Sequence, residues 1–284
     1  MSAAQKVRDQ LNAPGILTVP SCFDAISARL IERHGFPMAF MSGFATAGAN
    51  FGVPDLGLLS YGEILDQGRL MTQAVSIPII GDGDTGYGNA LNVKRTVNGF
   101  ADAGFGCVLI EDQAWPKRCG HTAGKQTVDF DEAVTRVKAA VDAREEGADI
   151  LILARTDTRA THGLEEAIRR ANAFRDAGAD ILFVEAPKSE AEMRQICAEA
   201  PGVHLANLVE DGDTPMLSPE QLQEIGYKLA IYPLTLFSAS LQAMSNVLSE
   251  LQATQQHSQD LMRFSTVQDL VGFKDYYDAA KRYE

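Results

Sequence analysis

Short apolar runs alternate with longer amphipathic stretches along nearly the whole chain. Each run has four to six residues rich in valine, isoleucine and leucine, which is typical of a strand buried on both faces of a parallel sheet. Eight such strands are predicted, at residues 16–19, 38–42, 77–82, 107–111, 150–155, 181–185, 204–208 and 229–232. Helical periodicity follows each of them, at residues 24–34, 61–74, 92–103, 130–146, 164–177, 190–199, 219–225 and 234–251.

Eight strands, each followed by a helix, predict an α/β fold: a closed (β/α)₈ barrel of the TIM type. Several predicted helices end at a glycine, as in Ala103-Gly104, Glu146-Gly147 and Ala177-Gly178, which supports their boundaries. A doubly wound open sheet is the alternative, although such a sheet rarely contains so many regular units.

The chain continues beyond the predicted barrel. No low-complexity linker divides residues 1–253, and we predict that they form one catalytic barrel domain. Residues 254–284 are predicted to be a C-terminal helical extension, with a polar stretch at 255–259 and one final helix over 266–282. A helix tethered by a polar linker is suited to pack on a neighbouring subunit.

Composition and charge narrow the class of protein. With 284 residues, 45% of them hydrophobic, the chain has enough apolar material for a substantial core. Its formal net charge of −13 disfavours nucleic acid and anionic membranes as partners. A small anionic substrate is still compatible with this charge, because a local cluster of cations can attract it.

The cysteines and the N-terminus indicate the cytoplasm. Cys22, Cys107, Cys119 and Cys197 are widely spaced and form no Cys-x-x-Cys pair, which disfavours disulfides and a structural zinc site. Residues 1–12 are polar and lack the apolar segment of a signal peptide. No apolar run approaches the ~20 residues of a membrane span. We therefore predict a cytoplasmic protein.

Polar side chains occur at the end of almost every predicted strand. They are Ser42, Asp82, Asp84, Glu111, Arg155, Glu185, Asn207 and Glu210. Active sites of (β/α)₈ barrels lie at the carboxyl ends of the strands, so these side chains are expected to converge. The set indicates a pocket for a metal ion and an anion, although Glu210 is equally explained as a solvated loop acid.

Three of these acids are candidate metal ligands. Asp82 and Asp84 lie in a turn after the third predicted strand, and Glu111 ends the fourth. Carboxylates and water suit Mg²⁺, with Mn²⁺ as the alternative ion. Backbone capping is the other explanation for two aspartates in a turn. The glycines at 81, 83, 86 and 88 are expected to let the backbone approach a ligand closely.

A cysteine among cations is the second candidate centre. Cys119 follows Lys117 and Arg118, and Gly120 and His121 come after it. This positive field favours a thiolate or ready proton transfer, and the polar neighbours predict an exposed loop rather than a buried segment. The alternative for Cys119 is inert packing, which we expect for the other three cysteines. His121 either polarises a substrate oxygen or hydrogen-bonds within its own loop.

The remaining groups at the strand ends suit an anion. Arg155 offers a guanidinium that can hold a carboxylate through two parallel hydrogen bonds, or else it forms a structural ion pair with Glu185. Asn207 adds a hydrogen-bonding amide. Ser42, with Gly43 after it, offers a hydroxyl and a backbone N–H to a second carboxylate.

Five motifs occur along the chain in a fixed order. They are Met41-Ser42-Gly43, Gly81-Asp82-Gly83-Asp84-Thr85-Gly86-Tyr87-Gly88, Glu111-Asp112-Gln113, Lys117-Arg118-Cys119-Gly120-His121 and Ala154-Arg155-Thr156-Asp157. Together they resemble the isocitrate lyase/phosphoenolpyruvate mutase superfamily, over a region from about Val19 to Leu241. The resemblance implies a (β/α)₈ barrel whose last helix is swapped between subunits, a homotetramer, one Mg²⁺ per site and a 2-hydroxy or 2-oxo dicarboxylate substrate.

The resemblance also implies roles for the candidate residues. Cys119, Arg155 and His121 match the catalytic group, with the cysteine as proton donor to the departing carboxylate enolate. The implied substrate-binding residues are Ser42, Gly43, Gly120, Glu185 and Asn207. The implied metal-site residues are Asp82, Asp84 and Glu111.

Departures from related patterns narrow the substrate. The chain has Ser238 where methylisocitrate lyases carry a carboxylate-binding arginine, and Phe40 where they tend to have tyrosine. The segment with Trp115-Pro116 is most similar to that of 2,3-dimethylmalate lyase and the related petal death protein. A Mg²⁺-dependent carbon–carbon lyase that cleaves a 2-alkylmalate into pyruvate and a carboxylic acid is therefore implied. Oxaloacetate acetylhydrolase and carboxyphosphonoenolpyruvate phosphonomutase are the alternatives, and methylisocitrate lyase and a non-catalytic dicarboxylate-binding barrel are less favoured.

Overall fold

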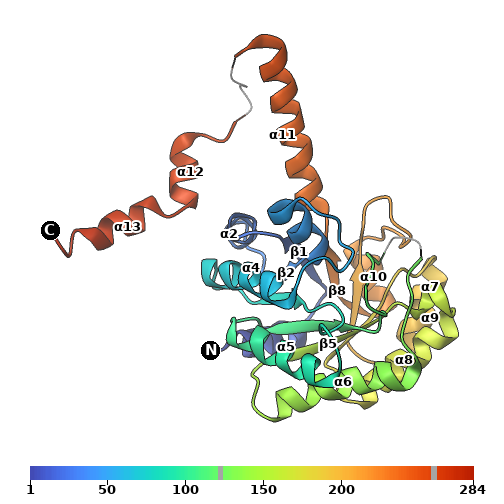
Figure 1. The fold of residues 1–284 in the computed structure, drawn as a ribbon. Helices are drawn as coiled ribbons and strands as arrows, with labels where there is room; N and C mark the ends of the chain where they lie inside the picture. The colour runs from blue at the N-terminus through green and yellow to red at the C-terminus, as the bar shows by residue number, and fades with distance from the viewer. Residues whose placement is uncertain (121–123, 257–260) are drawn as a thin grey trace. The chain divides into compact units, whose positions relative to one another are not determined.

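Eight parallel strands form a closed barrel in which each strand pairs with its neighbours in chain order. The computed structural model describes residues 1–120, 124–256 and 261–284 (Figure 1). The strands are β1 (Leu17–Cys22), β2 (Ala39–Met41), β3 (Ile79–Asp82), β4 (Cys107–Glu111), β5 (Leu151–Thr156), β6 (Ile181–Val184), β7 (His204–Asn207) and β8 (Tyr227–Tyr232). The ring closes where β1 pairs with β8, from Leu17 opposite Leu229 to Pro20 opposite Tyr232.

Helices surround this barrel. They are α1 (Ala3–Asn12), α2 (Ala25–Arg33), α3 (Gly43–Thr46), the π-helix η1 (Ala47–Phe51), α4 (Tyr61–Ala74), α5 (Ala90–Asp102), α6 (Phe130–Glu145), α7 (Thr158–Thr161), α8 (Leu164–Asp176), α9 (Glu190–Glu199) and α10 (Pro219–Ile225). The eight predicted strands and the predicted barrel are confirmed. The helices predicted between the strands are present within a few residues of their expected bounds, whereas α1, α3, η1 and α7 were not predicted.

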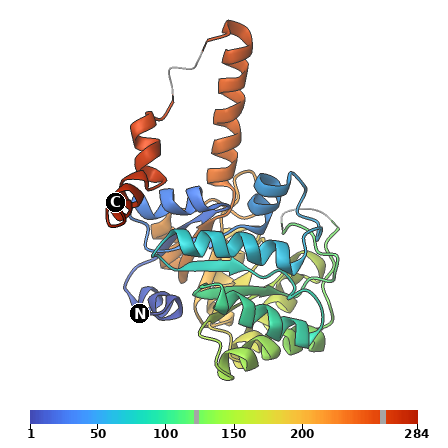
Figure 2. The ribbon, with the colours of Figure 1, turned by 60° about the vertical axis from the view of Figure 1, so that its left-hand side comes forward.

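The apolar strand residues fill the barrel interior. Val19, Ile80 and Leu153 are fully buried in one cluster with side chains from the other strands. Ala4 and Val7 of α1 join the same cluster, and Lys6 of α1 donates to the Ser76 carbonyl just before β3. Figure 2 shows α1, in dark blue, at the end of the barrel where the strands begin. The apolar core is therefore covered at that end, and the polar strand ends lie at the other.

The glycine-rich turn after β3 is shaped by the barrel itself. A Cβ atom at Gly83 would lie 2.6 Å from the Leu109 carbonyl oxygen, and one at Gly86 would lie 2.4 Å from Val93. Gly86 also has a φ of 82°, a left-handed conformation that glycine adopts without strain. These glycines make room for neighbouring elements of the fold, and their expected close approach to a ligand stays a prediction.

The chain from Leu236 to Glu284 forms a second compact unit, and the barrel unit is Met1–Thr235. The second unit contains most of α11 (Thr235–Thr254), with α12 (Phe264–Leu270) and α13 (Phe273–Ala280). The single final helix predicted over 266–282 was wrong, since Gly272 has a φ of 87° and separates α12 from α13. The domain boundary expected after residue 253 stays a prediction.

Candidate active site

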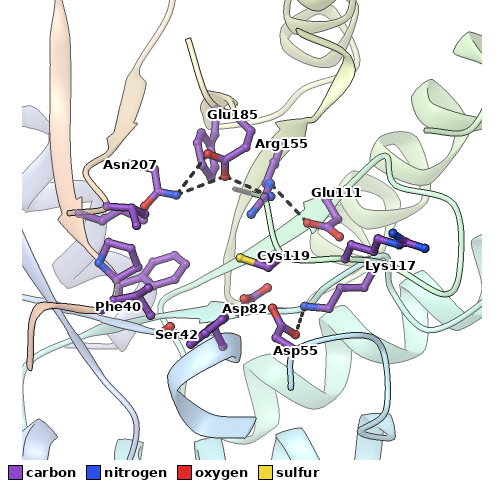
Figure 3. A pocket seen from close by; sticks show the side chains of 18 residues that line it. Phe40, Ser42, Asp55, Asp82, Glu111, Lys117, Cys119, Arg155, Glu185 and Asn207 are labelled. Carbon is purple, nitrogen blue, oxygen red and sulfur yellow. Dashed lines mark hydrogen bonds and ion pairs between the residues drawn. The ribbon is translucent and has the colours of Figure 1, made fainter. Parts of the chain in front are cut away.

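A cavity of about 210 Å³ opens at the carboxyl ends of the strands (Figure 3). Its polar lining comes from Ser42, Asp55, Asp82, Glu111, Lys117, Arg118, Cys119, Gly120, Arg155, Glu185 and Asn207. Its apolar lining comes from Phe40, Phe44, Phe183, Val209, Ile231, Pro233 and Leu234. Six of the eight predicted strand-end residues therefore converge on the cavity, and Asp84 and Glu210 do not line it.

Asp82 is held at the end of β3 by backbone donors. Its Oδ2 accepts from the Gly43 N–H at 3.1 Å, and its Oδ1 accepts from the Asp84 N–H at 3.2 Å. A Cβ atom at Gly43 would lie only 2.6 Å from Asp82 Oδ2. Gly43 was predicted to donate to a substrate, but in the structure its N–H orients Asp82. Burial, and then the nearby Asp84 charge, raise the pKa of Asp82 to about 6.

Lys117 lies among carboxylates on the same side of the cavity. Its ammonium contacts Asp55 and lies 2.7 Å from Asp84 Oδ1, and the side chain is only 5% exposed. The expectation that the residues around Cys119 are exposed was wrong for Lys117, because these two acids neutralise its charge. The carboxylates outweigh burial and raise the pKa of Lys117 well above its usual value. Tyr87 donates to the other Asp84 oxygen at 2.9 Å.

Glu111 provides the test of whether this side fits a metal ion. Within the part of the chain that the structure describes, its buried Oε1 atom has no hydrogen-bond partner. Burial raises the pKa of Glu111 well above its usual value. A buried oxygen with no partner among hard carboxylate donors fits Mg²⁺, which takes one or two carboxylates and keeps several waters. In the described residues no three Asp, Glu, His or Cys side chains are arranged for direct ligation of one ion, so a site here relies on such waters.

The opposite side of the cavity is organised around Arg155. Its Nε donates to Asp157 Oδ2 at 2.8 Å, and its Nη2 donates to Asp157 Oδ1 at 3.0 Å. Nη2 also lies 3.1 Å from Glu185 Oε2, and Nε lies 3.4 Å from Glu111 Oε2. The ion pair with Glu185 that the sequence left open is present. Asn207 Nδ2 donates to both Glu185 oxygens, at 3.3 and 3.2 Å.

Cys119 lies between these two sides. Figure 3 shows its sulfur directed into the cavity, with Asp82 on one side and Arg155 and Glu185 on the other. The preceding segment is shaped by Gln113, whose side chain both accepts from the Arg118 N–H and donates to the Arg118 carbonyl, each at 2.9 Å. The thiol is thus aimed at the space between the carboxylates and the guanidinium.

Other predicted residues lie around the cavity in different ways. Ser42 lines it, and its hydroxyl accepts from the Ala45 N–H as the N-cap of α3. Asp84 does not line the cavity, but it contacts Lys117, which does. Glu210 is exposed and does not line the cavity. His121 lies outside the described residues.

The sequence reasoning missed three contributors. Asp55 was not considered, Lys117 was treated only as a neighbour of the cysteine, and Asp157 was not assigned a role. Asp55 lies in a loop without periodicity, and only its contact with Lys117 reveals it. Asp157 follows directly after β5, which is the one signal that could have drawn attention to it.

The sequence pattern of the phosphoenolpyruvate phosphomutase family matches residues 7–252. This chain belongs to that family. It therefore belongs to the superfamily of phosphoenolpyruvate mutase and isocitrate lyase, as the five sequence motifs indicated.

Curated relatives in this family carry different activities. The chain is 38% identical to 2,3-dimethylmalate lyase of Eubacterium barkeri, over 100% of this chain and 99% of the relative. It is 41% identical to a chloroplastic carboxyvinyl-carboxyphosphonate phosphorylmutase of Arabidopsis thaliana, over 95% and 81%. It is 40% identical to a 2-methylisocitrate lyase of Aeropyrum pernix, over 95% and 87%. The relatives do not fix the substrate.

Solved structures of the family have the same fold. A crystal structure of 2,3-dimethylmalate lyase matches with a TM-score of 0.95 and 35% identity, over 100% of this chain and 96% of that one. Oxaloacetate acetylhydrolase with 3,3-difluorooxalacetate matches with a TM-score of 0.95 and 30% identity, over 99% and 97%. Phosphonopyruvate hydrolase, solved with oxalate and Mg²⁺, matches with a TM-score of 0.88 and 28% identity, over 100% and 99%.

These matches establish the chain as an enzyme of the lyase and mutase group, in the class of carbon–carbon lyases. A search of the described helices finds none with the length and apolar character needed to cross a bilayer.

Proposed function

We propose that this enzyme cleaves the C2–C3 bond of a 2-alkylmalate such as 2,3-dimethylmalate, with bound Mg²⁺ or Mn²⁺. The products are a 2-oxo acid, pyruvate in this case, and a carboxylic acid. One observation carries the proposal: the Cys119 thiol faces a cavity with carboxylates on one side and a guanidinium on the other. This arrangement supplies a cation site, an anion site and a proton donor around one small substrate.

The cation site is on the Asp82 side. Asp82, with Asp84 and Glu111 nearby, would hold Mg²⁺ directly or through water, since these residues offer hard oxygen donors. An ion held there would supply Lewis-acid stabilisation of negative charge on a substrate oxygen.

The protein's own groups act on the rest of the substrate. Arg155 holds a substrate carboxylate by charge-assisted hydrogen bonds, and Glu185, which accepts from Asn207, helps to keep the guanidinium in place. The C2 hydroxyl gives its proton to one of the carboxylates that line the cavity as the C2–C3 bond breaks, and the electron pair of that bond remains on the second carboxylic acid as an enediolate. Cys119 donates its proton to that carbon, a general-acid role typically worth about 10²–10⁴-fold in rate.

The apolar part of the lining favours an alkyl-substituted substrate. Phe40, Phe183 and Ile231 are each at most 3% exposed and present only hydrocarbon to the cavity. A methyl group buried there gains about 0.8 kcal/mol for each CH₂-sized unit, which an unsubstituted substrate such as oxaloacetate forgoes. Oxaloacetate acetylhydrolase activity remains the second candidate, supported by the 0.95 TM-score to that enzyme.

A product assay tests the proposal. The purified enzyme with Mg²⁺ is incubated with 2,3-dimethylmalate, other alkylmalates, 2-methylisocitrate and oxaloacetate, and pyruvate, acetate and oxalate are measured. We expect pyruvate from an alkylmalate and its loss after EDTA treatment. Acetate and oxalate from oxaloacetate, with no cleavage of alkylmalates, would select the second candidate. Absence of turnover with Mg²⁺-dependent binding of oxalate would indicate a binding protein.

We also propose a cytoplasmic homotetramer that exchanges C-terminal helices and has no nucleic-acid or membrane partner. Leu241, Met244, Leu248 and Leu251 lie at helical spacing on α11 and are each 47–64% exposed, a stripe that another chain can cover. Light scattering should give four times the chain mass of 30.7 kDa, and Leu248→Glu should lower it. A monomeric wild-type protein contradicts this assembly.

A further inference from the structure

Asp157 holds one edge of the Arg155 guanidinium, and Glu185 Oε2 lies 3.1 Å from Nη2. Asp157 accepts from Nε and Nη2 through two parallel hydrogen bonds, at 2.8 and 3.0 Å. Among residues 1–120, 124–256 and 261–284, Nη1 has no hydrogen-bond partner, while the side chain lines the cavity. Asp157 therefore fixes the plane of the guanidinium and determines where Nη1 points.

Asp157 is itself held in place by a buried hydrogen-bond network around Asp112. It is fully buried, and its backbone N–H donates to Asp112 Oδ1 at 2.9 Å. Asp112 Oδ2 accepts from Thr156 Oγ1 at 2.6 Å and from Arg170 of α8 at 3.0 Å. These bonds leave Asp157 little freedom, so any group that contacts its carboxylate is located relative to Arg155.

Lys125 is such a group, and it also contacts the residue after the thiol. Its ammonium lies 3.0 Å from Asp157 Oδ1 and donates to the Gly120 carbonyl, and its side chain is only 4% exposed. Gly120 in turn rests against the guanidinium, because a Cβ atom there would lie 2.4 Å from Arg155 Nη2. The backbone next to Cys119 is thus attached to the same carboxylate that orients Arg155.

We propose that Lys125 and Asp157 are positioning residues that couple the placement of the Cys119 thiol to the orientation of Arg155. The proposal rests on the proposed function for the roles of Cys119 and Arg155. Neither Lys125 nor Asp157 lines the cavity, so both act through another residue. The coupling has a defined origin: one carboxylate accepts from the guanidinium and from the ammonium that holds the Gly120 carbonyl.

The first test does not need turnover. The rate of Cys119 alkylation by iodoacetamide, located by peptide mass spectrometry, is measured in the full-length protein and in Lys125→Met, Asp157→Asn and the double variant. The control is Lys138→Met, an exposed lysine of α6. Buried Cys22 reports global unfolding, since burial raises its thiol pKa to about 12 and it should stay unlabelled in any folded variant.

We expect each single variant to alter the Cys119 labelling rate by at least about threefold, and the double variant to show no further change, because both substitutions break one link. A Lys125→Met rate equal to that of Lys138→Met overturns the proposal, as do single effects that multiply in the double variant. If a single variant does not fold, the double variant replaces it in the test, since it removes both buried charges. The proposal then requires that the Cys119 labelling rate of the double variant differ from that of Lys138→Met.

Turnover of the alkylmalate that the wild type cleaves supplies a second readout. Lys125→Met should lower kcat on the order of 10²-fold with a smaller change in KM, because the thiol is misplaced. Lys125→Arg should recover most of kcat, since a cation again reaches both oxygens. If Lys125→Arg folds and its Cys119 is alkylated at the wild-type rate, but its kcat does not recover, the proposal is contradicted. If the wild type cleaves no alkylmalate, the proposed function fails, and the labelling still tests the coupling.

Discussion

Lys117 is a buried cation and Arg155 a partly buried one, and both lie among carboxylates, yet they prepare opposite sides of the cavity for different ligands. Lys117 carries a compact charge between Asp55 and Asp84, so its ammonium is already paired with carboxylates of the protein. Arg155 is planar, and Asp157 occupies one edge of it while another nitrogen remains for a ligand. The shape of the cation, more than the number of acids around it, separates the two roles.

The largest expected effect concerns the group between the two sides. Cys119→Ser should lower kcat by about 10²–10⁴-fold, because serine is a far weaker acid than a thiol. Both sides of the cavity remain intact, so oxalate should bind with Mg²⁺ as tightly as to the wild type, measured by calorimetry. Wild-type turnover by this variant would exclude Cys119 as the proton donor.

Lys117→Met tests the carboxylate side. Removing the ammonium leaves Asp55 and Asp84 without their buried counter-charge, which should destabilise the metal-free protein by about 3–5 kcal/mol in urea unfolding. Added Mg²⁺ should restore part of this loss through binding to the folded state. Lys138→Met is the matched control and should unfold like the wild type. Equal stability of the two variants would show that the buried pairing is not needed.

Arg155→Lys tests the guanidinium side. A lysine cannot bind Asp157 and a substrate carboxylate with two edges at once, so KM should rise about 10- to 100-fold, the equivalent of one or two charge-assisted hydrogen bonds. The dependence on Mg²⁺ should change little, since Asp82 keeps its backbone donors and Arg155 contacts Glu111 only at 3.4 Å. Steady-state kinetics at several Mg²⁺ concentrations measures both quantities. A shifted Mg²⁺ dependence would mean that the two sides are not separable.

The smallest effect is a pH dependence. Asp82 has a pKa of about 6 in the folded metal-free protein, above the unfolded value, so the folded state retains its proton as pH rises past 4. The contribution of Asp82 to the free energy of unfolding therefore falls between about pH 4 and 6 and stays low above that range. Asp82→Asn should stabilise the metal-free protein at pH 7.5 by about 1–3 kcal/mol and much less at pH 4. The same gain at both pH values would contradict the raised pKa.

The fold was readable from the sequence because buried parallel strands are apolar without interruption. The runs at 107–111 and 181–185 became β4 and β6 almost residue for residue. The helix α1 was missed although Ala4, Val7 and Leu11 recur at helical spacing, since residues 1–12 were judged by their overall polarity. The break at Gly272 was missed because one glycine within an apolar and polar alternation does not by itself end a helix.

The site was readable only where residues follow strands. Asp82 and Glu111 end their strands and Arg155 is next to last in β5, and a barrel must bring such positions together. The burial of Lys117 depends on Asp55, which lies 62 positions earlier in an irregular loop, and no local pattern links them. The contact between Lys125 and Asp157 also joins distant positions. Pairings of this kind become visible only in three dimensions.

Trp115 gives the cavity a built-in optical reporter. It is the chain's single tryptophan, it is 48% exposed, and its ring centroid lies 6.1 Å from that of Tyr87, which donates to Asp84. A Cβ atom at Gly57 would come within 3.1 Å of the indole, so the ring rests on bare backbone two residues from Asp55. Its emission therefore originates beside the cation site, and ligand titrations can be followed in the unlabelled enzyme.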